Sequence, residues 1–133
     1  QIKDSQRMSL FKSHRPEYHD GEQKRDFLYI KDAVHMTLWL TENPSSTGLF
    51  NLGNGLARTW LDLGNSIFAA LKLNAKIDFM EMPEILRGKY QYFTQATIEK
   101  LRSQGFENKL FSLEDAVNDY VRNYLVPDLR LGS

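Results

Sequence analysis

The sequence Arg-Asp-Phe-Leu-Tyr-Ile-Lys-Asp-Ala-Val at residues 25–34, followed by Phe-Asn-Leu-Gly-Asn-Gly at residues 50–55, decides the fold of this 133-residue chain. The apolar run 27–30 predicts a strand covered on both faces, and a helical pattern follows it, with Asp32 as the expected cap. The second run predicts a short strand, 49–52, that ends in a Gly-x-Gly turn. Strands that alternate with helices indicate an α/β protein, in which phosphorylated ligands bind near the strand ends.

The other elements are expected from their capping residues and apolar periods. They are strands at 8–11 and 76–82, helices after Thr59 and Ser112, a helix at 94–104 closed by Gly105, and a helical turn opened by Pro83. Residues 12–24 are hydrophilic and contain a proline and a glycine, so we expect an exposed, mobile loop. The predicted fold class is therefore α/β (α+β), with short mixed strands and about four helices in a single domain, residues 1–133.

Composition excludes several classes of function. Seventeen basic and seventeen acidic residues cancel, so no overall field favours nucleic acid or a membrane surface. The chain has no cysteine, which excludes disulfides, thiolate metal sites and a cysteine nucleophile. Its three histidines lack metal-ligand spacing, so no metal site is expected. No apolar run approaches the roughly 20 residues of a membrane span.

The runs at 25–34 and 50–55 resemble the second half of the extended short-chain dehydrogenase/reductases that act on nucleotide sugars. The run Leu-Arg-Gly-Lys-Tyr-Gln-Tyr-Phe-Thr-Gln-Ala at 86–96 is similar, within that superfamily, to the ADP-glyceromanno-heptose 6-epimerase family. The resemblance implies a cytoplasmic, NADP-dependent isomerase of lipopolysaccharide inner-core synthesis. Such an enzyme inverts carbon six of an ADP-heptose by transient oxidation to a ketone.

Two motifs of that superfamily are absent from this sequence: the Gly-x-x-Gly-x-x-Gly turn that binds the cofactor and the catalytic Tyr-x-x-x-Lys pair. We therefore expect the chain to be the C-terminal, substrate-binding part of such an enzyme, without its N-terminal Rossmann core. It should carry no catalytic group, bind no cofactor and be inactive alone, with NADP held by the parent. Strands 27–30 and 49–52 would then present unpaired edges, so we also expect a homo-oligomer.

Arg25 is the strongest candidate for ligand binding. A guanidinium fixed at the mouth of a buried strand matches two oxygens of a pyrophosphate. The alternative is that Arg25 and Asp26 form a solvated pair at the strand end. The resemblance implies that Arg25 contacts the diphosphate of the sugar nucleotide.

Arg87, Lys89 and Tyr90 form a second candidate cluster on a glycine-containing turn that suits a phosphorylated ligand. The resemblance assigns substrate binding to Tyr90. Arg87 and Lys89 are secondary candidates, because surface charges need no function. Tyr92 suits a substrate contact and a core position equally.

Phe11, Lys12, Ser13 and His14 align with a segment that lines the nucleotide pocket of the family. An aromatic ring such as Phe11 suits packing against adenine, and the next two residues offer polar contacts. The Gly-x-Gly turn is not expected to bind a dinucleotide, because Arg58 stands where the third glycine would be; the resemblance implies that the turn shapes the far wall of the pocket.

Two alternatives stay open from the sequence. A nucleotide-sugar 4-epimerase or 4,6-dehydratase shares the first two runs, although the run 86–96 argues against it. A non-catalytic α/β interaction module is the alternative from a different class.

Overall fold

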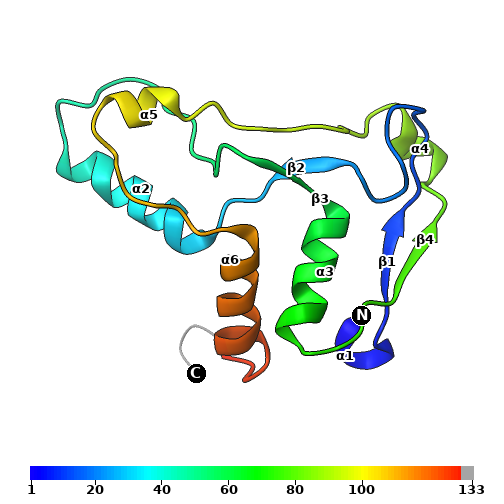
Figure 1. Ribbon diagram of the computed structural model, residues 1–133. Helices are drawn as coiled ribbons and strands as arrows, with labels where there is room; N and C mark the ends of the chain where they lie inside the picture. The colour runs from blue at the N-terminus through cyan, green and yellow to red at the C-terminus, as the bar shows by residue number, and fades with distance from the viewer. Residues whose placement is uncertain (130–133) are drawn as a thin grey trace.

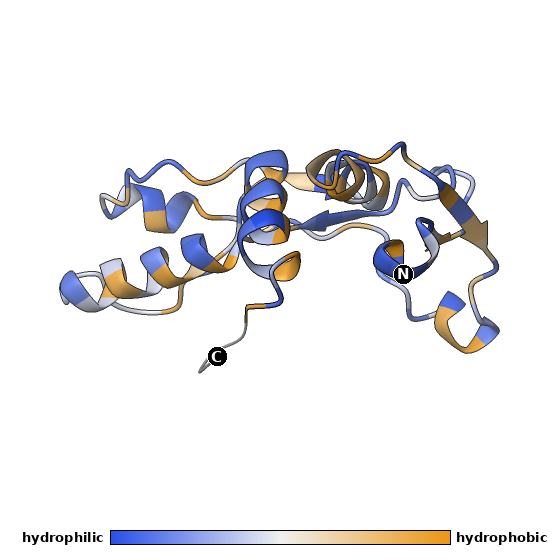
Figure 2. Cartoon of the chain, turned by 90° about the horizontal axis from the view of Figure 1, so that it is seen from below, coloured by the Kyte–Doolittle hydropathy of each residue, from blue (hydrophilic) through white to orange (hydrophobic). Residues whose placement is uncertain are grey.

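The computed structural model describes residues 1–129 of the 133. The helices are α1 Ile2–Ser5, α2 Ile30–Glu42, α3 Trp60–Ala70, α4 Glu84–Arg87, α5 Glu99–Ser103, α6 Leu113–Tyr120 and the π-helical turn η1 Val121–Leu125. The strands are β1 Met8–Phe11, β2 Lys24–Asp26, β3 Ala57–Thr59 and β4 Ile77–Met80. Short mixed strands among helices confirm the predicted α/β class. The chain is elongated, with α2 and α5 at one end and β1, β4 and α4 at the other (Figures 1 and 2).

Two small sheets hold the chain together. β1 and β4 pair in parallel, with Phe11 opposite Met80, which confirms the strands expected at 8–11 and 76–82. β2 and β3 pair antiparallel, with Arg25 opposite Arg58. The parallel pair places the carboxyl ends of β1 and β4 side by side, next to α4 (Figure 1).

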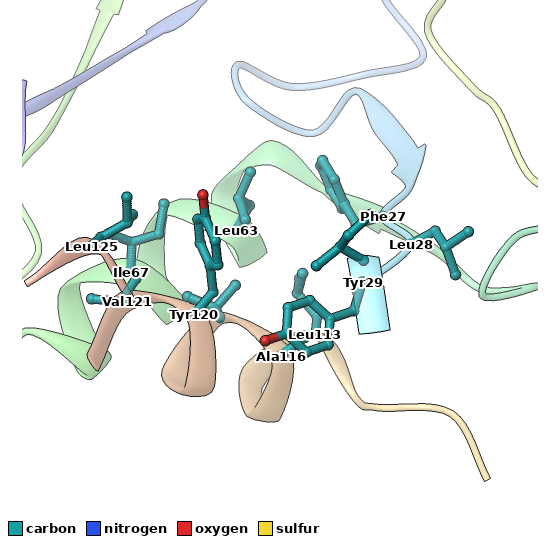
Figure 3. A pocket seen from close by; sticks show the side chains of 12 residues that line it. Phe27, Leu28, Tyr29, Leu63, Ile67, Leu113, Ala116, Tyr120, Val121 and Leu125 are labelled. Carbon is teal, nitrogen blue, oxygen red and sulfur yellow. The ribbon is translucent and has the colours of Figure 1, made fainter. Parts of the chain in front are cut away.

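The strands expected at 27–30 and 49–52 are wrong. β2 ends at Asp26 and α2 begins at Ile30, while residues 49–52 are outside the described helices and strands. The apolar residues of the first run instead line a groove of about 550 Å³ between α3 and α6 (Figure 3). Only Tyr29 of the run 27–30 is buried, while Ile30 is 63% exposed, so the run is not covered on both faces as a central strand would be.

The buried side of helix α2 packs into the core at one end of the molecule. Met36 is fully buried and packs with Leu101 and Phe106, which form the core cluster there. The opposite side of α2 is apolar and exposed, with Val34 at 47% and Leu38 at 51% of their full exposure. This side of α2 is therefore not covered by the described residues.

Asp32 does not cap α2. The N-cap is Tyr29, and Asp32 is buried two residues into the helix, where its carboxylate accepts a hydrogen bond from the backbone N–H of Phe111 at 3.0 Å. The side chain therefore ties α2 to a segment 79 residues away. Capping rules consider only neighbouring residues in the sequence, so they predicted a capping role for Asp32 that the structure does not show.

The caps of the central helices are as predicted. Thr59 opens α3 with a capping box, in which its hydroxyl accepts from the N–H of Asp62 and the Asp62 carboxylate accepts from the N–H of Thr59. Ser112 opens α6 and accepts from the N–H of Asp115. Each cap satisfies otherwise unpaired amides at the helix start. α3 and α6 pack against each other in the centre of the chain (Figure 1).

The helix expected at 94–104 is shorter than predicted, since only α5 is helical in that range. Its end is as predicted: Gly105 has a φ of +106°, and the N–H of Phe106 turns back to the carbonyl of Leu101. Phe106 is fully buried there.

Candidate functional site

The candidate site lies at the carboxyl ends of the parallel strands β1 and β4. Lys12 directly follows β1 and Glu81 directly follows β4, and the backbone N–H of Lys12 continues the ladder to the carbonyl of Met80 at 2.9 Å. Lys12 Nζ donates to Glu81 Oε1 at 2.8 Å. Phe11, the last residue of β1, meets the ring of Tyr90 edge-on at 6.4 Å between centroids. Ligands of α/β proteins bind at this edge of a sheet.

Arg25 points its guanidinium at the ring of Tyr90, with 5.1 Å between Cζ and the ring centroid. One nitrogen of the Arg25 guanidinium is held by the backbone, because Nη1 donates to the carbonyl of Lys24 at 2.8 Å. Within residues 1–129, no carboxylate lies within ion-pair distance of Arg25. The structure thus brings together Arg25, Tyr90 and Phe11, three of the predicted site residues, and leaves this guanidinium without a carboxylate partner inside that range.

Residues 90–94 reach the site because this segment runs along β2. The N–H of Lys24 donates to the carbonyl of Tyr92 at 2.8 Å, and the N–H of Thr94 donates to the carbonyl of Lys24 at 3.2 Å. This isolated parallel bridge fixes Tyr90 beside Arg25. No pattern within either run of sequence indicates the pairing.

Tyr92 takes the core role of the two that the sequence left open. It is 4% exposed, its hydroxyl accepts from the N–H of His14 at 2.8 Å, and its ring packs against Tyr18 and Tyr90. Arg15 stacks on the same ring, 4.7 Å from the centroid. The sequence did not single out Arg15, since it lies in a polar loop without a motif.

The loop 12–24 is only partly exposed, which corrects the prediction for its second half. Gly21 and Gln23 are buried, and Gln23 Nε2 donates to the carbonyl of Phe11 at 3.3 Å. Ser13 has local partners: its N–H donates to Asp20 Oδ1 at 2.7 Å and its hydroxyl donates to the carbonyl of Arg15 at 2.9 Å. Ser13 therefore shapes the loop in this structure.

His14 and Arg87 both lie near Glu81. His14 Nε2 and Arg87 Nη2 are each 3.7 Å from Glu81 Oε2, and Arg87 Nε donates to the carbonyl of Met82 at 3.0 Å. The Lys12 ammonium and these neighbours lower the pKa of the Glu81 carboxyl, with the Lys12 hydrogen bond as the largest cause. The Lys89 side chain is exposed, so the structure gives it no role beyond a surface charge.

A hollow of about 440 Å³ lies beside the aromatic residues of the site. Phe11, Tyr90 and Gln23 line it together with Trp60. The indole N–H of Trp60 is buried and has no hydrogen-bond partner within residues 1–129. Trp60 is the first residue of α3, and the apolar period of that helix gives no sign of this donor.

Asp26 does not pair with Arg25. Its carboxylate accepts three backbone N–H groups, from Asn54 at 2.6 Å, Gly55 at 3.0 Å and Ala96 at 2.9 Å. Asp26 therefore closes the Gly-x-Gly turn onto the segment after Tyr90. The alternative of a solvated Arg-Asp pair is wrong.

The Gly-x-Gly turn does not fit the pyrophosphate of a dinucleotide. Two of its amides, those of Asn54 and Gly55, already donate to Asp26, and β3 follows the turn before α3 begins. Gly53 faces the same carboxylate, since a Cβ there would lie 2.8 Å from Asp26 Oδ2. The turn therefore acts as a structural joint rather than a phosphate cradle.

Residues 1–129 contain no group of three His, Asp or Glu side chains arranged to hold a metal ion. None of the helices described over that range is long and apolar enough to cross a membrane.

A second ionic cluster lies at the joint between α2 and α6. Asp119 accepts from the Tyr29 hydroxyl, from Lys31 Nζ at 2.6 Å and from Asn123 Nδ2 at 2.6 Å. These hydrogen bonds, with that from Lys31 the strongest, lower the pKa of Asp119 from 3.8 to about 2. Burial and the same carboxylate raise the pKa of Tyr29 to about 12. The cluster is structural, since it ties the start of α2 to the C-terminal helix.

Comparison with known proteins shows that this chain is similar to proteins named as sugar-nucleotide epimerases. The model of the NAD dependent epimerase/dehydratase family matches residues 2–53. A Nitratidesulfovibrio vulgaris protein named ADP-L-glycero-D-manno-heptose-6-epimerase is 51% identical over 118 residues, which cover 89% of this chain and 36% of that protein. A Fusobacterium nucleatum protein of the same name is 42% identical over 134 residues, which cover 96% of this chain and 40% of that protein. The resemblance stated from the sequence is therefore confirmed, and the chain spans about two-fifths or less of these relatives.

Solved structures give the same fold. The Helicobacter pylori ADP-L-glycero-D-manno-heptose-6-epimerase superposes with a TM-score of 0.71 at 24% identity, over 92% of this chain and 34% of that one. A UDP-N-acetylglucosamine 4-epimerase from Methanobrevibacter ruminantium superposes with a TM-score of 0.76 at 18% identity, over 96% and 37%. At these identities the likeness shows the fold alone, which this chain shares with about a third of each of the two structures.

Proposed function

We propose that this chain is the substrate-binding portion of an NADP-dependent ADP-glyceromanno-heptose 6-epimerase, and that it binds an ADP-sugar. One observation carries the proposal: the guanidinium of Arg25 is held on the ring of Tyr90, beside Phe11, without a carboxylate partner within residues 1–129. A preorganised guanidinium next to aromatic rings suits a diphosphate joined to a nucleoside. The names of the relatives at 42–51% identity support an ADP-heptose as the ADP-sugar.

The residues of this chain bind and orient the substrate. Arg25 Nη1 is committed to the backbone, so the rest of the guanidinium faces the diphosphate, while Phe11 packs against the adenine and Tyr90 keeps Arg25 in place. Lys12, Ser13 and His14 contribute polar contacts at the same strand ends, and Arg87 is a secondary contact. Holding the sugar in one orientation lowers the entropy cost of the reaction that follows.

The cofactor site lies elsewhere in the parent enzyme under this proposal. NADP would supply the hydride acceptor and donor for inversion at carbon six. The Gly-x-Gly turn of this chain is filled by Asp26, which supports placing the dinucleotide outside these residues. The 133-residue chain alone should then show no epimerase activity, and NADP-dependent epimerisation by the purified chain would contradict this.

The proposal extends to the setting of the parent. It would be a cytoplasmic homo-oligomer that serves lipopolysaccharide inner-core synthesis. Edge strands at 27–30 and 49–52 no longer support self-association, because those strands are not formed. The exposed apolar side of α2, with Val34 and Leu38, supports it instead.

A binding titration tests the substrate class. We expect the chain to bind ADP more tightly than UDP or dTDP, and Tyr90→Ala to weaken ADP binding by on the order of tenfold through the loss of the ring that supports Arg25. Lys89→Ala is the matched control on the same turn and should leave affinity unchanged. Tighter binding of UDP or dTDP than of ADP would favour the 4-epimerase or 4,6-dehydratase alternative. No binding of any of them would favour a non-catalytic interaction module.

A further inference from the structure

Glu81 is the centre of a charge arrangement that the proposed substrate contacts do not explain. One of its oxygens accepts from Lys12 Nζ at 2.8 Å, and the other lies 3.7 Å from both His14 Nε2 and Arg87 Nη2. Three basic side chains from two segments, the loop after β1 and the helix α4, thus converge on one carboxylate. The Glu81 side chain is 60% exposed, so its position is open to solvent.

The position of Glu81 is fixed by the fold. Phe11 and Met80 are partners in the parallel register, and Lys12 and Glu81 are the next residues along each strand. The Arg87 guanidinium is held close by the hydrogen bond from Nε to the carbonyl of Met82. The carboxylate therefore lies at the strand edge that also carries Phe11 of the candidate site.

We propose that Glu81 is an internal counter-ion, which occupies the place of a ligand anion next to Lys12 and is displaced from Lys12 when a phosphorylated ligand binds. The inference rests on the proposed function, since it concerns the same site. Glu81 opposes every anion that approaches Lys12, and only a ligand with enough negative charge replaces it. Glu81 is thus a specificity-determining residue that weakens the binding of phosphorylated ligands next to Lys12 and leaves ligands without a phosphate unaffected.

The physical consequence is a defined effect on affinity. Glu81→Gln keeps the size of the side chain and removes its charge, so Lys12 becomes available to the ligand and one repulsive charge disappears. Exposed charges interact weakly, so we expect ADP to bind about three- to fivefold more tightly. Adenosine carries no phosphate, and its affinity should not change.

Calorimetric titration of the 133-residue chain with ADP and with adenosine at low salt tests this. Asp78→Asn is the matched control, since Asp78 lies on β4, three residues before Glu81, and pairs with Arg7. It removes the same charge away from Lys12 and should leave ADP affinity unchanged. In a Lys12→Met background, Glu81→Gln should lose most of its effect, because the released ammonium is absent.

Each outcome separates the inference from the proposed function. Unchanged ADP affinity in Glu81→Gln, in a chain whose ADP binding is weakened by Arg25→Ala, would overturn the role of Glu81 and keep the proposed function. The role of Glu81 would also be overturned if Asp78→Asn gave a similar gain in ADP affinity, or if Glu81→Gln gave an equal gain in adenosine affinity. A full gain in ADP affinity from Glu81→Gln in the Lys12→Met background would overturn it too. Absence of ADP binding in both the unmodified chain and Glu81→Gln would overturn the proposed function itself.

Discussion

Replacement of Asp26 tests how the site is held together. Asp26→Ala removes the acceptor of three backbone N–H groups, those of Asn54, Gly55 and Ala96, at 2.6 to 3.0 Å. A hydrogen bond to a charged acceptor contributes about 1.5–3 kcal/mol, less where water replaces it. Because Asp26 is only partly buried, we take the lower end of that range for each of the three bonds and expect a loss of about 4–5 kcal/mol in the free energy of unfolding. Domains of this kind have about 5–15 kcal/mol in total.

Asp26→Asn should destabilise the chain less than Asp26→Ala does. The amide keeps one oxygen, so it retains the two bonds of Oδ2 at best and turns an N–H₂ towards the N–H of Asn54. We expect a loss of about 2 kcal/mol, between the unmodified chain and Asp26→Ala. Urea unfolding followed by tryptophan fluorescence measures both, and hydrogen exchange of the three amides reports the joint directly.

The control is Asp78→Ala, which removes an exposed strand carboxylate paired with Arg7 and should leave the free energy of unfolding nearly unchanged. If Asp26→Ala unfolds within about 0.5 kcal/mol of the unmodified chain, or if the amides of residues 54, 55 and 96 keep their exchange rates, Asp26 is not the joint described here.

Two further predictions concern stability. The depressed pKa of Asp119, about 2 against 3.8, contributes stability that is present above about pH 4 and is lost as the pH falls towards 2. The difference in urea stability between the unmodified chain and Asp119→Asn should therefore shrink between about pH 5 and about pH 2, and a constant difference would refute the assignment. Gly53→Ala should cost about 1–3 kcal/mol, because the new Cβ meets Ala96 and Asp26, whereas Gly88→Ala has open space and should be neutral or stabilising by up to about 1 kcal/mol. Thermal unfolding of both glycine variants measures this, and equal Tm shifts would contradict it.

The parts of the fold that the sequence predicted depend on neighbouring residues. The Thr59 capping box and the Ser112 cap join residues three apart, and the turn at Gly105 closes on its own helix. Such features need only the local order of side chains. The strands at 8–11 and 76–82 were found for the same reason, although their parallel pairing was not predicted.

The parts that failed depend on distant partners. The run 27–30 lines the groove between α3 and α6, and the same apolar composition would suit a strand in a sheet. Asp32 was taken for a cap because its partner, Phe111, lies 79 residues away.

The candidate site shows the same division. Arg25, Tyr90 and Phe11 were named from motifs and resemblance, and the structure brings them together. The sequence did not predict the contacts of Glu81 or the hydrogen bonds from three backbone amides to Asp26. Each depends on residues that are distant in the sequence, which pattern rules do not consider. The only available signal for Glu81 was a charged residue close to the C-terminal end of the predicted strand 76–82.

The most direct test of the account is the affinity of the intact parent enzyme for its ADP-sugar when Arg25 is replaced. Arg25→Ala removes the guanidinium that Tyr90 supports, and we expect binding to weaken by on the order of 10- to 100-fold, with Arg25→Lys only partly restoring it because an ammonium lacks the planar fork. Unchanged affinity in Arg25→Ala, in a protein with an unaltered Tm, would contradict the claim that this guanidinium binds the diphosphate.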